Sequence, residues 1–203
     1  MRGDETSRRR GIQAAVLLAG VLLLLAGCGG GKKGSTSTTG PGNAKATPGI
    51  AVVKTSEGSF SIRLDVKDSP HTVASFEQLA RKKFFNGTIF HRIVPGFVIQ
   101  GGDPTGTGSG GPGYTTVDVP PANTTYLHGT VAMANTGADP PGTAGSQFFV
   151  VTGANGGLSP IYAVLGHVVS GLAVVDRIGT FGNSQTEKPT KRVVVESITI
   201  TAA

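Results

Sequence analysis

FHRIVPGFVIQGGD, residues 90–103, is the stretch of sequence on which the fold depends. Two short apolar runs flank Pro95-Gly96, where proline fixes its own φ and glycine can adopt a positive φ, so the stretch predicts a tight turn between two antiparallel strands. In such a hairpin, Arg92 and Gln100 can approach each other from opposite strands if their side chains point to one face. A cation and an amide would then lie beside aromatic and branched apolar side chains, which indicates a polar group at the edge of an apolar pocket.

This stretch resembles the signature of the cyclophilins, a family of peptidyl-prolyl cis-trans isomerases. Two further blocks agree with the family, GTVAMAN at residues 129–135 and GSQFFVVT at residues 145–152. Three ordered blocks at family-like spacing are more specific than one short motif, and the resemblance extends from about Gly49 to the C-terminus. It implies an all-β fold, in which eight antiparallel strands close into a barrel capped by two helices, and an isomerase that needs no cofactor.

The resemblance also implies roles for individual side chains. Arg92 would be the catalytic donor that stabilises the nitrogen of the proline, and Gln100 would orient it. The other residues would contact the substrate: His91, Phe97, Val98, Met133, Ala134, Asn135, Gln147, Phe149 and Leu158. From the residues alone, an ordinary core fits Phe97, Val98, Met133 and Phe149 equally well, and His91 taken alone fits a structural histidine. An unpaired arginine, by contrast, is costly to bury.

The chain departs from the better-known cyclophilins in one block. Gly157 stands where eukaryotic members often have tryptophan, and Tyr162 stands where they often have histidine. The loop 158–161 between these two positions also differs from the family pattern.

Residues 1–28 read as a lipoprotein signal segment. Arg8, Arg9 and Arg10 precede an apolar run over residues 12–25, which is shorter than a membrane-spanning helix requires. The run ends in Leu-Ala-Gly-Cys28, which resembles a bacterial lipobox and implies lipidation of Cys28 at the extracytoplasmic face of the cell membrane. An uncleaved membrane anchor is the alternative, and the segment 7–10 fits a twin-arginine export signal only loosely. Cys28 is the single cysteine of the chain, so the exported domain must fold without a disulfide.

The rest of the chain divides into a tether and one domain. Residues 29–48 are rich in Gly, Ser, Thr and Lys, without apolar periodicity, and predict a flexible linker ahead of the domain at 49–203. Within the domain, Ser69 and Pro70 predict the start of a helix that runs to about Lys83, and Gly179 predicts the end of a second helix over 172–178. The remaining strands are expected at residues 50–54, 59–65, 129–134, 147–152, 162–169 and 192–201.

Charge, motifs and residue spacing argue against several other classes of function. The net charge of +6 comes from scattered basic residues without an aromatic platform, so no nucleic-acid partner is expected. The glycine-rich loop 101–113 lacks the Gly-Lys-Ser/Thr ending of a phosphate-binding loop, and no helix follows it. The four histidines have no metal-ligand spacing, and no Ser-His-Asp motif is evident.

The sequence therefore predicts an exported, lipid-anchored prolyl isomerase that acts as a monomer on proline-containing peptides and unfolded exported proteins. A non-catalytic peptide-binding chaperone on the same fold is the alternative, because a fold does not determine a function. A purely structural lipoprotein would leave the combination of Arg92, Phe97, Gln100 and Phe149 unexplained.

Overall fold

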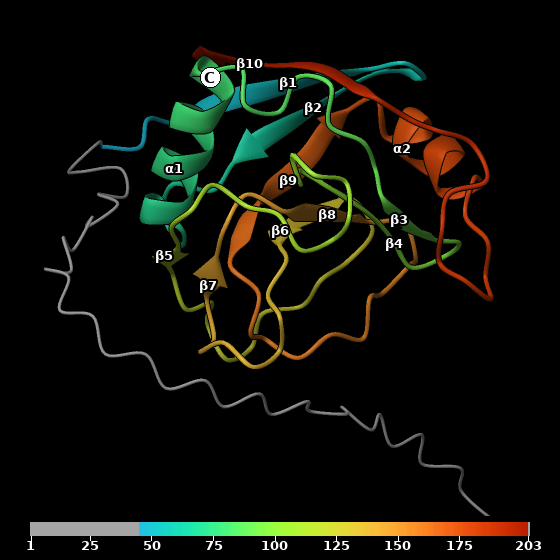
Figure 1. Ribbon diagram of the computed structural model, residues 1–203. Coiled ribbons are helices and arrows are strands. Elements are labelled where there is room, and N and C mark those ends of the chain that lie inside the picture. The colour runs from blue at the N-terminus through green and yellow to red at the C-terminus, as the bar shows by residue number, and fades with distance from the viewer. Residues whose placement is uncertain (1–44, 203) are drawn as a thin grey trace, which may run out of the picture. The chain divides into compact units, whose positions relative to one another are not determined.

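The structure, a computed structural model, describes residues 45–202. The predictions about the signal segment, Cys28 and most of the linker lie outside the described residues. The elements follow one another as β1 Gly49–Thr55, β2 Gly58–Leu64, α1 Pro70–Arg81, β3 Arg92–Val94, β4 Val98–Gly101, β5 Thr116–Val117, β6 Thr130–Met133, β7 Thr143–Ala144, β8 Phe148–Val151, β9 Val164–Ser170, α2 Leu172–Gly179 and β10 Val195–Ala202 (Figure 1). No helix in this part of the chain is both long and apolar enough to cross a membrane.

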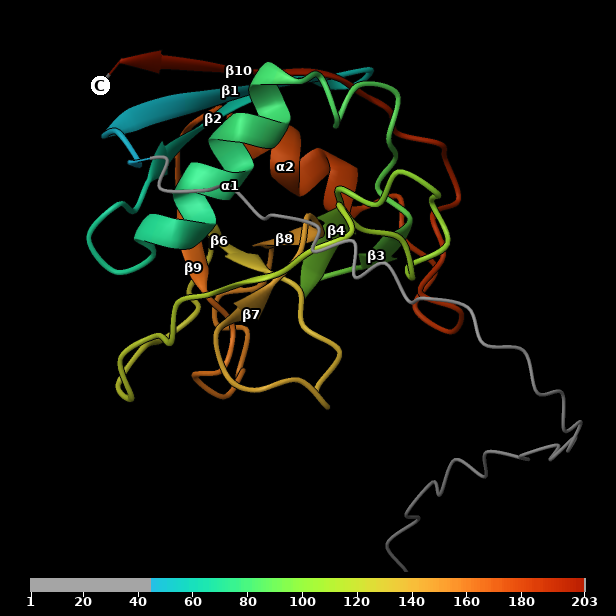
Figure 2. The same ribbon diagram turned by 60° about the vertical axis from the view of Figure 1, so that its left-hand side comes forward.

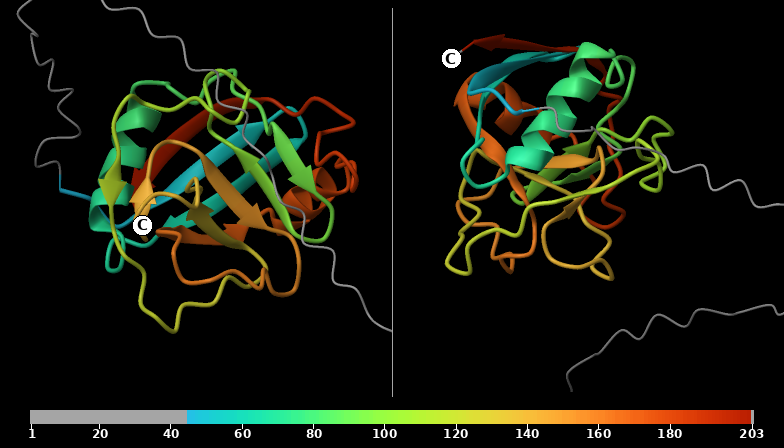
Figure 3. Two further views of the ribbon diagram at one scale, coloured as in Figure 1. Left: turned by 60° about the horizontal axis from the view of Figure 1, so that its bottom comes forward. Right: turned by 90° about the vertical axis from the view of Figure 1, so that its left-hand side faces the viewer.

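Eight of the strands form one antiparallel sheet in the order β10-β1-β2-β9-β6-β8-β4-β3, and the sheet curls on itself (Figure 3). This confirms the expected all-β fold with eight main strands and two helices. Helix α1 packs against β10 and β5, and α2 packs against β2, β3 and β4. The two helices therefore lie over different parts of the sheet, as Figure 1 shows, and α1 comes to the front in Figure 2.

The closed barrel is not confirmed. β10 and β3 stand at the two ends of the sheet order, and among residues 45–202 only a single bridge, Ile89 to Val194, joins the segments that precede them. β3 is three residues long, and its outer edge is covered by a loop, because the Ile93 amide donates to the Glu187 carbonyl at 2.9 Å. A loop that covers an edge strand satisfies its backbone groups as a neighbouring strand would.

Two local features differ from the sequence predictions. β5 and β7 pair as a separate two-stranded sheet, and strands of two residues are too short to show a hydrophobic period. Ser69 is the N-cap of α1 as expected, but its side chain makes no capping bond. Instead the Asp118 carboxylate, from a distant loop, accepts the Thr72 amide at 2.6 Å and so places a negative charge at the helix N-terminus.

The main core lies between the sheet and the helices. Its centre is a group of buried phenylalanines, in which Phe148 makes edge-on contacts with Phe76, Phe85 and Phe90 at ring-centroid distances of 5.9, 6.1 and 6.2 Å. Edge-to-face packing of this kind is the favoured aromatic arrangement. The rigid core that results supports strands β3, β4, β6 and β8, which carry the site.

Candidate active site

The side chains of the central strands point alternately into the main core and toward a second face of the sheet. Ile99 and Phe148 point into the main core, whereas Val98 and Phe149, their neighbours in sequence, join a smaller apolar cluster on the other face. Successive side chains of a strand point to opposite faces, so each strand contributes every second residue to the site. Met133 therefore faces away: it is 1% exposed in the main core, while Ala132 and Ala134 belong to the cluster on the site face.

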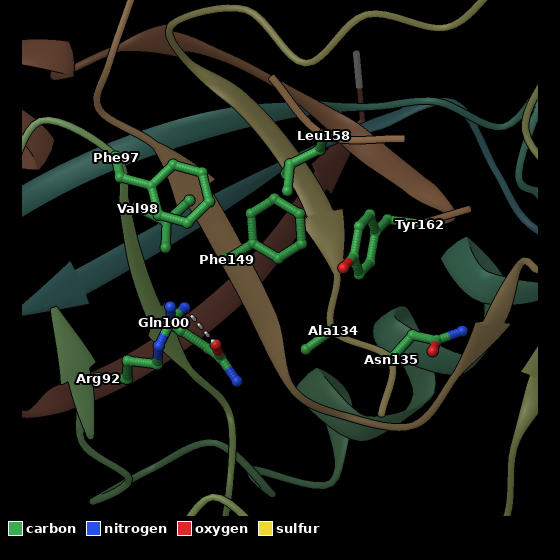
Figure 4. Close-up of a pocket in the computed structure, with 9 residues that line it drawn as sticks. All are labelled: Arg92, Phe97, Val98, Gln100, Ala134, Asn135, Phe149, Leu158 and Tyr162. Atoms are coloured by element: carbon green, nitrogen blue, oxygen red, sulfur yellow. Dashed lines mark hydrogen bonds between the residues drawn. The ribbon is translucent and has the colours of Figure 1, made fainter. Parts of the chain in front are cut away.

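A cavity of about 270 Å³ opens on this second face (Figure 4). Its lining includes eight of the residues predicted to act at the site, together with Tyr162. The lining residues are Arg92, Phe97, Val98, Gln100, Ala134, Asn135, Phe149, Leu158 and Tyr162. The fold thus brings together the hairpin β3–β4, the end of β6, strand β8 and the loop that leads to β9.

Aromatic rings give the cavity a rigid apolar wall. The rings of Phe149 and Tyr162 meet edge-on at 5.4 Å, and Tyr126 packs behind both of them. The buried Tyr126 hydroxyl donates to the Tyr162 carbonyl at 2.7 Å and accepts from the Tyr162 amide at 3.1 Å. Burial raises the pKa of Tyr126 more than the bond to Tyr162 lowers it, so the hydroxyl stays neutral and fixes the backbone of Tyr162.

Arg92 lies at the rim of the cavity and is held from two sides. It is directly opposite Gln100 in the ladder between β3 and β4, as the sequence predicted, and its Nη1 donates to Gln100 Oε1 at 3.3 Å (Figure 4). Its Nε donates to Glu187 Oε2 at 2.6 Å, and its guanidinium carbon lies 5.9 Å from the centroid of the Phe97 ring. Sequence reasoning missed Glu187, because a single acid in a polar loop 95 residues away carries no signal of this contact.

Gln100 is itself fixed by a chain of hydrogen bonds that reaches the glycine-rich loop. Gln100 Nε2 donates to Gln147 Oε1 at 3.0 Å. Gln147 Nε2 donates to the carbonyls of Gly108 and Gly110, both at 2.9 Å. Gln147 therefore lies beside the main cavity and lines an adjoining one of about 240 Å³. These hydrogen bonds fix the orientations of the Gln100 and Gln147 side-chain amides, since each amide nitrogen faces an oxygen.

Asp103 anchors the glycine-rich loop, whose carbonyls accept the hydrogen bonds from Gln147. Its carboxylate is fully buried and accepts five hydrogen bonds, from the amides of Thr105, Thr107, Gly108 and Gly110 and from the Thr105 hydroxyl. Burial alone would raise the pKa of Asp103, but the hydrogen bonds from Thr105, Gly110 and Gly108 outweigh it and leave the pKa far below its ordinary value. Gly110 passes so close to the carboxylate that a Cβ would collide with Asp103 Oδ1.

His91 does not line the cavity. Both ring nitrogens are buried without a hydrogen-bond partner among the described residues, and the ring lies next to Gly108 of the loop. Burial lowers the pKa of His91, and Arg92 lowers it further, against an opposing effect of Asp103. The histidine is therefore neutral near pH 7 and supports the loop by packing.

The arrangement suits binding of a small apolar ring next to a fixed cationic donor. The walls are apolar, and the guanidinium at the rim offers a planar set of hydrogen-bond donors. No group of side chains that could hold a metal ion occurs within residues 45–202. The polar groups at the cavity can donate and accept hydrogen bonds, and they include no obvious nucleophile paired with a base.

Comparisons with known proteins agree with this geometry. Residues 50–200 match the family model described as cyclophilin type peptidyl-prolyl cis-trans isomerase/CLD. The peptidyl-prolyl cis-trans isomerase A of Mycobacterium tuberculosis is 38% identical over 179 residues, which cover 78% of this chain and 95% of that protein. The peptidyl-prolyl cis-trans isomerase B of Streptomyces anulatus is 39% identical over 172 residues, which cover 74% of this chain and 95% of that protein.

A solved structure supports the fold. The crystal structure of a cyclophilin type isomerase from Cryptosporidium parvum, obtained in the presence of the dipeptide Ala-Pro, superposes with a TM-score of 0.69 at 29% sequence identity. The match covers 76% of this chain and 99% of that one.

Proposed function

Since the chain belongs to the cyclophilin family and is a peptidyl-prolyl cis-trans isomerase, we propose that it isomerises X-Pro peptide bonds in the cavity beside Arg92. The observation that carries this assignment is the position of the Arg92 guanidinium, which Gln100 orients at the rim of an apolar cavity walled by Phe149. The related structure was determined in the presence of Ala-Pro, which supports a proline-containing peptide as the ligand here.

The chemistry requires no bond to be made or broken by the protein. Rotation about an X-Pro bond meets a barrier of about 18–20 kcal/mol, because the nitrogen lone pair is delocalised into the carbonyl. Midway through the rotation that lone pair is localised on nitrogen and can accept a hydrogen bond. A preorganised cationic donor in a site with little water stabilises this state more than the planar ground state. Arg92 would be this donor.

The other residues at the site would hold the substrate while the bond turns. Phe97, Val98, Phe149 and Leu158 would grip the proline ring in the cavity. Ala134, Asn135 and Gln147 border the adjoining cavity and would contact the backbone that precedes the proline. With the ring fixed, the preceding carbonyl swings, and no cofactor takes part.

Exchange spectroscopy tests the assignment directly. The purified protein should accelerate the exchange between cis and trans signals of an X-Pro peptide, measured by NMR at substoichiometric enzyme. Binding of the peptide without faster exchange would contradict the catalytic assignment and support a peptide-binding chaperone instead.

The N-terminal sequence supports a location for this activity. We propose that residues 1–28 direct export, that Cys28 is lipidated, and that the 29–48 linker holds a monomeric domain at the extracytoplasmic face of the membrane. Unfolded exported proteins would be the substrates there.

Replacing Cys28 by alanine should release the protein from the membrane. The apolar run over residues 12–25 is too short to be a stable permanent anchor, so retention would depend on the lipid. Fractionation of cells that express only the Cys28→Ala variant would show it, with Ser35→Ala in the same N-terminal region as the matched control. A variant that loses its signal segment yet stays with the membrane fraction would rule out the lipid anchor.

A further inference from the structure

We propose that Glu187 is a positioning residue for catalysis: it fixes the guanidinium of Arg92 in the orientation from which Arg92 acts on the substrate. This inference rests on the proposed role of Arg92. Glu187 lies in the loop between α2 and β10, far from the cyclophilin signature blocks, and touches the catalytic hairpin from the outer edge of β3.

The two contacts of Arg92 act at different parts of its guanidinium. Glu187 Oε2 accepts from Nε at 2.6 Å, and Gln100 Oε1 accepts from Nη1 at 3.3 Å. Two points of attachment define the plane of a rigid guanidinium, whereas one leaves it free to rotate. The contact with Glu187 is the shorter and is assisted by opposite charges, so it is the stronger of the two. Nη2 makes none of the hydrogen bonds found among residues 45–202.

The backbone of the loop holds Glu187 in register with β3. The Glu187 carbonyl accepts the Ile93 amide at 2.9 Å, next to Arg92 in sequence. The Glu187 amide donates to the Asn183 carbonyl at 2.7 Å, and the Asn183 side chain accepts the amides of Gln185 and Thr186 at 2.9 and 3.0 Å. The carboxylate is therefore presented by a loop that is tied both to itself and to the strand that carries Arg92.

Glu187 also adopts an unusual backbone conformation. Its φ is +58°, in the left-handed region that residues other than glycine seldom occupy. Such a conformation costs free energy and persists where the surrounding contacts determine it. Here the hydrogen bonds of the Glu187 amide and the Glu187 carbonyl hold this conformation, and from it the side chain reaches Arg92.

Stability alone gives little reason for this pair. The side chains of Arg92 and Glu187 are 32% and 47% exposed, and ion pairs with this much exposure contribute little to folding. The hydrogen bond from Arg92 lowers the pKa of Glu187, so the carboxylate is charged near neutral pH. Removal of Glu187 should then change turnover without a matching change in melting temperature.

The negative charge of Glu187 and its positioning of the Arg92 guanidinium should have opposite effects on the turnover rate, which makes the proposal testable. A carboxylate next to Arg92 reduces the positive potential at the cavity, so its removal would speed turnover if only charge mattered. If position matters more, removal slows turnover, because small displacements of a catalytic group are costly. We expect kcat of Glu187→Ala to fall about tenfold with little change in KM.

The experiment compares four variants with the wild-type protein by NMR exchange of an X-Pro peptide and by thermal unfolding. Glu187→Ala removes both charge and acceptor, and Glu187→Gln keeps an acceptor without the charge. Gln185→Ala is the matched control, because its side chain is exposed in the same loop and makes none of the described hydrogen bonds. Arg92→Ala and the double variant Arg92→Ala/Glu187→Ala complete a cycle that shows whether Glu187 acts through Arg92.

The proposal is supported if Glu187→Ala lowers kcat, if Glu187→Gln recovers part of the loss, and if removal of Glu187 has no further effect once Arg92 is absent. It is overturned if Glu187→Ala leaves kcat unchanged or raises it, or if Gln185→Ala lowers kcat equally. A normal rate in Arg92→Ala itself would be a different result, since it would contradict the role of Arg92 and not only that of Glu187.

Discussion

Replacement of Arg92 by alanine should slow prolyl isomerisation roughly 30-fold to 1000-fold, on the expectation that a charged hydrogen bond in this site is worth about 2–4 kcal/mol. The apolar cavity and the backbone contacts remain in this variant, and they hold the planar substrate in either isomer. The localised lone pair exists only near the transition state. Loss of a contact made only there lowers kcat more than it weakens binding.

Two further variants separate this role from simple binding. Arg92→Lys should restore little activity, because one ammonium on a flexible stem cannot keep the planar, two-point attachment to Gln100 and Glu187. Phe149→Ala removes a wall of the cavity, and we expect it to weaken peptide affinity and the rate together.

The measurement is NMR exchange of an X-Pro peptide, with affinity from titration of the same peptide and folding checked by circular dichroism. Near-normal exchange in a folded Arg92→Ala protein would show that the donor is elsewhere. It would also strengthen the alternative of a peptide-binding chaperone.

Replacement of Asp103 by asparagine should destabilise the domain by about 2–4 kcal/mol, since a charged acceptor of several buried amides is lost. For a domain of this size the melting temperature would fall by roughly 5–15 °C. An asparagine NH₂ group would also face amide donors that now meet an oxygen. The glycine-rich loop would loosen, and with it the carbonyl groups that fix Gln147 and, through Gln147, the orientation of Gln100 and Arg92. We expect kcat to fall by about 3- to 10-fold as a result.

The pH dependence of stability gives a second test of Asp103. Its pKa in the folded state lies below the ordinary value of 3.8, so its contribution to stability is fully present above that value and is lost as the pH falls toward the folded-state pKa. The difference in unfolding free energy between wild type and Asp103→Asn should therefore be constant near neutral pH and shrink below about pH 4. His91 nearby also has a lowered pKa, so the wild-type protein loses stability from that group as well once the pH falls below 6.5.

Denaturant unfolding at several pH values measures this difference, and Asp68→Asn is the control, because Asp68 is exposed and its carboxylate accepts none of the described hydrogen bonds. Equal stability of Asp103→Asn and wild type at pH 7 would show that the buried carboxylate does not hold the loop.

Much of the hairpin β3–β4 could be predicted from the sequence, because its determinants are local. Pro95-Gly96 sets the turn, and the turn sets the register that puts Arg92 opposite Gln100. Apolar runs of four or more residues located β6 and β8, whereas β5 and β7 carry too few residues to show a pattern.

Two kinds of feature differ from the sequence predictions: contacts between segments distant in sequence, and the face of the sheet to which a strand residue points. Met133 was expected at the site, yet its neighbours Ala132 and Ala134 face the cavity side, and a strand cannot turn consecutive residues to one face. Glu187 and Asp103 hold the site through contacts whose partners depend on the folded loops. Such contacts follow from tertiary packing, which periodicity and spacing do not describe.

The pair of tyrosines at the cavity has a practical consequence. The chain contains no tryptophan and three tyrosines, so its intrinsic fluorescence is that of tyrosine alone. Tyr162 lines the cavity, and Tyr126 packs against it from behind. A peptide that carries one tryptophan near its proline would bring the only indole of the complex close to these two emitters. Energy transfer from tyrosine to tryptophan would then report occupancy of the cavity directly, without a label and without any change to the protein.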